Sequence, residues 1–183
     1  MKSLPLVLSP PKRIHIAIMK KSWGLTEKIL SGEKTIESWW YQNRYPPWGK
    51  ISTGDIVYFK NSGEPVKLKA EVKKVLQFKN LTPEKVTQIL KKYGKDGGID
   101  EKDFEKYFNL FKNKKYCLLI FLEKVKKIKP FAINKTGFGA MAAWLTVVAD
   151  KFEKIKMETI TDDPPSPPVG GFGGQVVRNS GRD

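Results

Sequence analysis

Residues 31–40 carry the side chains of this chain that are best suited to chemistry. Lys34 and Glu37 follow a glycine, and two tryptophans, Trp39 and Trp40, come directly after them. An ammonium and a carboxylate in a partly closed cleft keep each other charged and offer a donor and an acceptor to the edge of a nucleobase. In a dry site the lysine would lose its proton more readily and act as a base. The alternative is a structural ion pair, because such pairs are common in folded proteins.

The position of Lys34 relative to the next strand decides whether the two charges meet. Side chains alternate between the faces of a strand, so Lys34 and Glu37 converge only if Lys34 still belongs to the turn. On the predicted strand 34–40, Glu37 and Trp39 share one face and Trp40 lies on the other. We expect one tryptophan to belong to the core and Trp39 to stack on a base, a contact that contributes about 1–3 kcal/mol.

The loop 41–50 is rich in aromatic residues and is stiffened by two consecutive prolines. It contains Arg44 and Trp48 besides two tyrosines. Its rings either cover the end of a barrel or form a stacking wall for a ligand, and the sequence supports the two interpretations equally.

The charge balance points to a polyanionic partner. The chain has 34 Lys and Arg against 19 Asp and Glu, which gives a formal net charge of +15 and a pI near 9.8. A lysine excess of this kind binds phosphate backbones without reading their sequence, and such binding weakens as salt rises. Lysine-rich surfaces also occur in proteins from hot environments, but there Glu rises together with Lys, which is not the case here. We therefore expect RNA or another nucleic acid as the partner.

Composition argues against several kinds of site. Cys117 and His15 are the single cysteine and the single histidine, so we expect no internal disulfide, no metal site, no cofactor and no Ser-His or Cys-His nucleophile. We interpret Cys117 as a buried small hydrophobe and His15 as an ordinary strand residue. No apolar run approaches the roughly 20 residues that span a bilayer, and the apolar patch 4–8 is too short for a signal peptide. The protein is therefore predicted to be soluble and cytoplasmic, with no membrane partner.

The alternation of apolar residues predicts strands interrupted by helices. We expect strands over 13–19, 34–40, 56–60, 66–78 and 116–122, the last with a basic continuation over 124–129. The phase of the alternation shifts near Lys73, which predicts a β-bulge. We also expect a short helix over 23–30 capped by Ser22, a helical insertion over about 82–112 whose second helix is capped by Asp100, and a last helix or strand over 151–159. Together they form one domain over 12–160, between an irregular lead over 1–11 and a disordered tail, rich in proline and glycine, over 161–183.

A short signature accompanies this order of elements. Gly32, Lys34 and Glu37 match a Gly-x-Lys-x-x-Glu-x-Arg pattern, and a Thr-Gly-Asp turn at 53–55 precedes the next strand. On these features, over roughly 12–122, the chain resembles the ASCH family of the PUA-like group. The resemblance implies an α+β fold, a small mixed, mostly antiparallel PUA-like β-barrel with flanking and inserted helices. It also implies a cleft beside the signature that takes RNA or a nucleobase.

The chain departs from the signature in one place. Ser38 stands where the signature has arginine, so an anionic group would be bound by another cation, Arg44 or Lys135. Some ASCH proteins resemble amidohydrolases of acylated cytidine, and others have been linked to RNA cleavage or transcriptional coactivation. The threonine that enzymatic members place beside the lysine would, by position, stand at Glu37.

The leading hypothesis is an RNA-binding domain that captures one unstacked base or nucleotide in a basic cleft. Its expected ligand-binding residues are Lys34, Glu37, Trp39, Arg44, Trp48 and Lys135. The alternative is a hydrolase of modified nucleosides or a ribonuclease, in which Lys34 activates water and Glu37 shuttles a proton. A third hypothesis is an adaptor that docks a protein through the loop 41–48.

Overall fold

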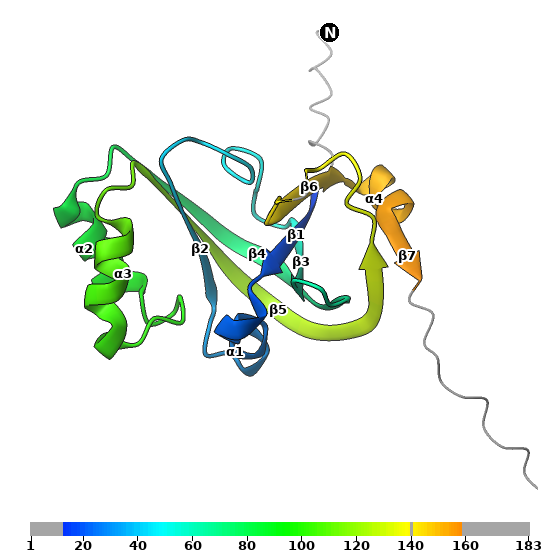
Figure 1. The fold of residues 1–183 in the computed structure, drawn as a ribbon, viewed down its shortest axis with the longest axis horizontal. Coiled ribbons are helices and arrows are strands. Elements are labelled where there is room, and N and C mark those ends of the chain that lie inside the picture. Colours follow the sequence, from blue (N-terminus) through cyan, green and yellow to red (C-terminus); the bar gives the residue numbers. More distant parts are fainter. Residues whose placement is uncertain (1–12, 140, 159–183) are drawn as a thin grey trace, which may run out of the picture.

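The computed structural model describes residues 13–139 and 141–158 (Figure 1). The predicted lead over 1–11 and tail over 161–183 lie outside the described residues. The described strands are β1 (Arg13–Met19), β2 (Ile36–Tyr41), β3 (Ile56–Asn61), β4 (Val66–Lys79), β5 (Tyr116–Ile133), β6 (Trp144–Val148) and β7 (Lys156–Glu158). The described helices are η1 (Lys21–Trp23), α1 (Leu25–Ser31), α2 (Pro83–Tyr93), η2 (Glu101–Asp103), α3 (Phe104–Phe111) and α4 (Ala149–Ile155). None of the helices in these two ranges has the length and apolar character that crossing a membrane requires.

The strands form one curled sheet, and the long hairpin of β4 and β5 bends through the whole molecule (Figure 1). The strand order is β2-β5-β4-β3-β1-β6, with β7 paired to β5. Neighbouring strands pair antiparallel except β1 and β3, which are parallel. This confirms the predicted α+β fold with a mixed, mostly antiparallel sheet, and the predicted barrel takes the form of a curled half-barrel. The two ends of the strand path are β2 and β6.

The bend of the hairpin coincides with breaks in the register between β4 and β5. One of these breaks lies between Val72 and Lys74, where the sequence predicts a bulge at Lys73. An extra residue in one strand leaves that residue unpaired and increases the local twist, which curls the sheet. On the partner strand Lys124 has a positive φ of 51°. The predicted strand 116–122 and its basic continuation are therefore one bent strand, β5.

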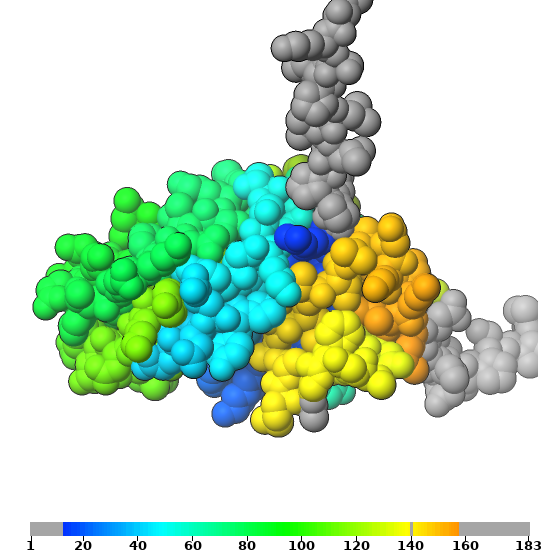
Figure 2. All heavy atoms as spheres, turned by 90° about the horizontal axis from the view of Figure 1, so that it is seen from above, coloured from blue at the N-terminus to red at the C-terminus, as the bar shows by residue number. Residues whose placement is uncertain are grey.

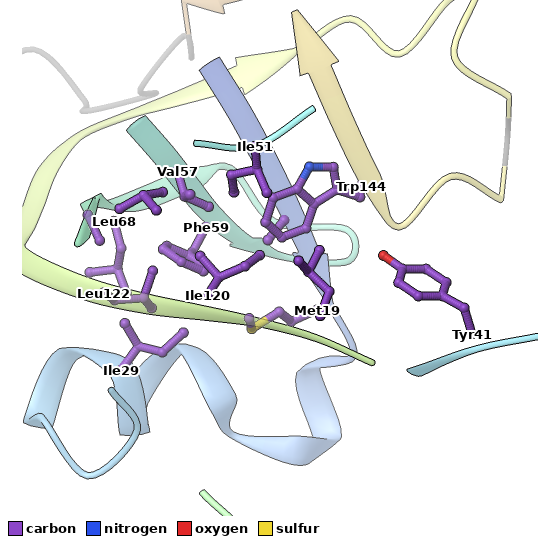
Figure 3. Packing of buried hydrophobic residues seen from close by; sticks show 14 residues of the cluster. Met19, Ile29, Tyr41, Ile51, Val57, Phe59, Leu68, Ile120, Leu122 and Trp144 are labelled. Carbon is purple, nitrogen blue, oxygen red and sulfur yellow. The ribbon is translucent and has the colours of Figure 1, made fainter. Parts of the chain in front are cut away.

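The main core lies on the inner face of the curled sheet (Figure 3). Val57, Phe59, Leu118 and Ile120 are fully buried there, and Ile29 of α1 closes one end. A second core lies on the outer face, and a third lies beneath α2. Buried residues of the second core are Ile16, Val66, Phe131, Leu145, Val147 and Phe152, and those of the third are Ile36, Ile89, Cys117 and Leu119. Cys117 is thus the buried small hydrophobe that the sequence predicts.

Two helices begin later than predicted. Ser22 lies within η1 rather than capping a helix, because Gly24 in the left-handed region (φ 59°) ends η1 and serves as the N-cap of α1. Asp100 makes no capping hydrogen bond, and residues 101–103 form η2 before α3 begins. By contrast, Thr82 caps α2 by accepting from the backbone N–H of Lys85. The segment 151–159, predicted to be either a helix or a strand, contains the end of the helix α4 and the strand β7.

Candidate functional site

The free edges of the sheet, β2 and β6, are bridged by aromatic side chains. Trp39 of β2 packs edge-on against Trp144 of β6, with 5.4 Å between ring centroids. Tyr41 lies beside Trp39 at 6.3 Å in a nearly parallel orientation, and Trp48 packs edge-on against Tyr41 at 6.3 Å. We call these four residues the seam. In Figure 2 the surface over residues 41–55 (cyan) borders the surface over residues 141–148 (gold), which include β6.

Arg44 and Lys135 flank the seam without entering it. The Arg44 guanidinium lies over the ring of Tyr116 at 5.7 Å, and Tyr116 packs against Trp48 at 5.3 Å. Lys135 donates from Nζ to the carbonyl oxygen of Ala142 at 3.1 Å, in the loop that leads into β6. The ring contacts therefore connect Arg44, Trp48 and Trp39, three of the predicted site residues, while Lys135 stabilises the neighbouring loop.

Three successive inward-facing residues of β2 each bury a polar atom that makes no hydrogen bond within the described residues. These atoms are Glu37 Oε2, Trp39 Nε1 and Tyr41 OH. On the opposite face of β2, Trp40 Nε1 is also buried without a hydrogen bond within the described residues. The Tyr41 hydroxyl points into the core cluster beside Met19 and Trp144 (Figure 3). A buried polar group without a partner costs about 1–3 kcal/mol. Within the row, this cost applies to Trp39 Nε1 and Tyr41 OH, because Glu37 Oε2 has the ammonium of Lys34 beside it.

Lys34 precedes the strand, as its convergence with Glu37 requires, because β2 begins at Ile36. Lys34 Nζ lies 3.1 Å from Glu37 Oε2, a distance that makes an ion pair but lacks hydrogen-bond geometry. The ammonium also donates to the carbonyl oxygens of Ile36 and Gly97, each at 2.8 Å. Lys34 is 3% and Glu37 6% exposed. The ammonium is therefore occupied on all sides by protein acceptors.

The partner Gly97 lies in the loop between α2 and η2, so Lys34 fastens the helical insertion to the start of β2. The next residue, Gly98, has a φ of 81°, and a Cβ there would lie 3.5 Å from the Lys34 side chain. This packing agrees with the alternative interpretation of the sequence, in which Lys34 and Glu37 form a structural ion pair. It does not favour a lysine that activates water, and the hydrolase hypothesis stays a prediction.

The second tryptophan and Ser38 face away from the seam. Trp40 stacks on Phe111 of α3 with 4.4 Å between centroids and an angle of 4° between planes. Ser38 and Trp40 also line the contact between β2 and the loop after α2. Trp40 therefore joins the sheet to the insertion, whereas Trp39 is half-buried against the main core.

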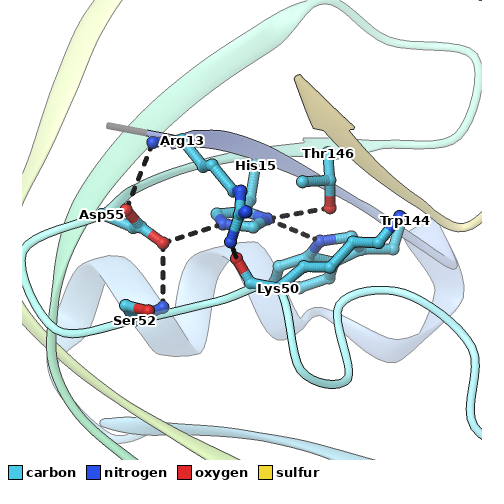
Figure 4. A network of polar contacts seen from close by, with 7 residues as sticks. All are labelled: Arg13, His15, Lys50, Ser52, Asp55, Trp144 and Thr146. Atoms are coloured by element: carbon cyan, nitrogen blue, oxygen red, sulfur yellow. Dashed lines mark hydrogen bonds and ion pairs between the residues drawn. The ribbon is translucent and has the colours of Figure 1, made fainter. Parts of the chain in front are cut away.

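A buried polar network that sequence reasoning missed holds Trp144 in place (Figure 4). His15, which is fully buried, contacts Trp144 Nε1 through Nδ1 at 3.1 Å and Asp55 Oδ2 through Nε2 at 3.2 Å. The indole N–H can only donate, so Nδ1 accepts and the proton of the neutral ring resides on Nε2, where it is donated to Asp55. Thr146 Oγ1 lies 3.0 Å from Nδ1, and the backbone N–H of Ser52 also donates to Asp55.

His15 is expected to make the fold sensitive to acid. Burial lowers the pKa of His15 below 6.5, and the hydrogen bond and charge of Asp55 oppose this only in part. As pH falls below about 6.5, the unfolded chain takes up the proton before the folded one, so the free energy of unfolding decreases. His15→Gln should remove this decrease, which urea denaturation between about pH 7.5 and pH 5 would measure. If the free energy of unfolding of both proteins fell equally between these pH values, His15 would not be the cause of the acid sensitivity.

No family model matches this chain, and no curated protein matches its sequence. Solved structures do match. The crystal structure of ASCH from Zymomonas mobilis aligns with a TM-score of 0.55 and 14% identity over 79% of this chain and 96% of that chain. Two crystal structures of single-residue mutants of the same protein give TM-scores of 0.56 at 15% identity, over 77% and 80% of this chain and 94% and 96% of those chains. The fold expected from the resemblance is thereby confirmed: the chain has the fold of an ASCH domain.

Proposed function

We propose that this domain binds nucleic acid, RNA in the first place, and that it takes one unstacked base at the seam. The observation that carries the proposal is the row of buried polar atoms on Glu37, Trp39 and Tyr41 that make no hydrogen bond within the described residues. Burial, and then the neighbouring Glu37, raise the pKa of the Tyr41 hydroxyl, so it stays a donor. The row therefore offers one carboxylate acceptor and two donors, groups that the edge of a base can satisfy.

Stacking supplies the second part of the binding energy. Trp39, Tyr41 and Trp48 present three rings in contact with one another. Trp48 belongs to the loop between β2 and β3 and is only half-buried, so we expect its ring to move aside and stack on the incoming base. Stacking on one aromatic ring contributes about 1–3 kcal/mol per base and tolerates any base.

In this proposal the charged residues have different roles, one positioning Glu37 and the others contacting phosphates. Lys34 supplies the counter-charge of Glu37 and holds it in place, so Lys34 is a positioning residue. Arg44 and Lys135 lie on the segments that flank the seam, where they would contact the phosphates next to the bound base. The remaining lysine excess gives the long-range attraction that brings a polyanion to the surface.

The test is binding of a short, fluorescently labelled single-stranded RNA, followed by anisotropy over a series of salt concentrations. The affinity should fall as salt rises, with a slope of about −0.7 for each phosphate neutralised. Trp39→Phe keeps an apolar ring but removes the N–H, and it should weaken binding about tenfold.

Trp23→Phe is the matched control, because Trp23 lies on η1 and is 61% exposed. This substitution should leave the affinity unchanged. An affinity that ignores salt, or an equal loss in the two tryptophan variants, would refute the proposal. The same strand made as DNA decides whether the 2′-hydroxyl contributes.

A further inference from the structure

A cavity of about 370 Å³ lies on the outer face of the sheet and is lined by lysines from three strands. Lys69 comes from β4, Lys129 from β5 and Lys156 from β7. The other lining residues are Tyr58, Ile128, Pro130 and Phe131, so none of the described residues that line the cavity is acidic. The carboxylate of Glu153 lies 3.7 Å from Lys156 in an exposed pair, where solvent screens it.

The aromatic wall of this cavity is fixed by the second core. The Tyr58 ring stacks on Phe152 of α4 with 4.9 Å between centroids and 17° between planes. Phe131 packs edge-on against Tyr58 at 5.5 Å. Tyr58 is half-buried, so its ring and hydroxyl form a preformed wall beside the ammonium groups. A rigid apolar surface next to convergent charges is typical of small-ligand sites.

Two of the lysines that line the cavity, Lys69 and Lys129, have no acidic partner among the described residues. Lys69 lies directly opposite Lys126 in the pairing of β4 with β5, and like charges in register destabilise a sheet. Neither of them forms an ion pair or a side-chain hydrogen bond with a described residue, and the same holds for Lys129. An anion bound beside Lys69 would offset the repulsion between Lys69 and Lys126. Lys69 and Lys129 therefore fit a ligand better than they fit the isolated sheet.

We propose that this cavity binds the phosphate group of a nucleotide, with Lys69 and Lys129 on the phosphate and Tyr58 against the attached sugar or base. Three ammonium groups and a hydroxyl are the donors that a phosphate accepts from, and the volume suits a single nucleotide. The site is separate from the seam, because Lys69 lies on the outer face of β4 while its neighbours Leu68 and Ala70 belong to the inner core. The phosphate belongs either to a free nucleotide or to a strand of nucleic acid.

The experiment follows the backbone amide resonances of Tyr58, Lys69 and Phe131 by NMR while ligands are added to the full chain. Adenosine 5′-monophosphate should shift these resonances, whereas adenosine should not. Lys69→Gln combined with Lys129→Gln should raise the Kd for the nucleotide about tenfold, because two charge-assisted contacts are lost. This variant should fold at least as well as the parent, because it relieves the repulsion with Lys126.

The matched control is Lys91→Gln with Lys102→Gln, an equal change of charge at exposed positions on the insertion. It should change the Kd less than about twofold. A single-stranded RNA that shifts the same resonances when the mononucleotide does not would assign the phosphate to a strand. Equal shifts with adenosine, or an equal loss in the control, would overturn the proposal. Trp39→Phe should leave nucleotide binding here unchanged, so failure at the seam and failure at this cavity are distinguishable.

Discussion

Tyr41→Phe is expected to stabilise the free protein by about 1 kcal/mol and to weaken RNA binding about tenfold. The substitution removes only the hydroxyl, whose oxygen is buried and makes no hydrogen bond within the described residues. The folded protein then no longer bears the desolvation of that group, while a bound base loses one donor. Urea denaturation measures the first effect and RNA anisotropy the second.

Opposite signs for stability and binding distinguish a ligand site from ordinary packing. Tyr107→Phe on α3 is the control, and it should change neither quantity. A variant of Tyr41 that loses stability would show that its hydroxyl has a partner in the free protein. A more stable variant with unchanged RNA affinity would remove Tyr41 from the proposed site.

Lys34→Met is expected to destabilise the fold by about 3–5 kcal/mol. The substitution leaves the Glu37 carboxylate buried without its counter-charge and removes the donor from the carbonyl oxygens of Ile36 and Gly97. Replacing both charged residues, Lys34→Met with Glu37→Met, should recover most of this loss, because two apolar groups need no pairing. Urea denaturation of the two single variants and the double variant measures the coupling.

The size of the coupling tells the two roles of Lys34 apart. A loss smaller than about 1 kcal/mol in Lys34→Met would mean that the ammonium is hydrated and free to act on a ligand. A large loss with strong recovery in the double variant identifies Lys34 as the residue that holds the insertion and pairs with Glu37.

The elements with a regular local pattern could be predicted from the sequence. The strict alternation over 13–19 gave β1 with its bounds, and the change of phase near Lys73 gave the bulge between Val72 and Lys74. The predicted start of the helical insertion at about 82 agrees with α2, whose N-cap is Thr82. Backbone details that depend on one residue were missed, because Gly24 in the left-handed region divides the predicted helix 23–30 into η1 and α1.

The sequence singled out Trp39 and Trp48 of the seam but not Tyr41 and Trp144, and it did not give the contacts. The spacing of Lys34 and Glu37 indicated an ion pair, yet the third partner, Gly97, lies 63 positions further along the chain. His15 looked like an ordinary strand residue because its partner Thr146 is 131 positions away. Asp55 in the Thr-Gly-Asp turn was the available signal, because a carboxylate directly before a strand that pairs with β1 can reach a histidine there. Contacts between residues so far apart in the sequence can be predicted only when the order of strands in the sheet is known.

The loop between α2 and η2 gives β2 more than a partner for Lys34. The carbonyl oxygen of Asp96 accepts from the backbone N–H groups of Thr35 and Ile36, at 2.8 and 2.9 Å. These two amides therefore exchange with solvent only when the loop lifts off, and the same opening exposes the Lys34–Glu37 pair to water. Docking of the insertion and burial of the signature carboxylate are one cooperative unit, so a ligand that depends on a charged, desolvated Glu37 is thermodynamically linked to helices that it does not touch.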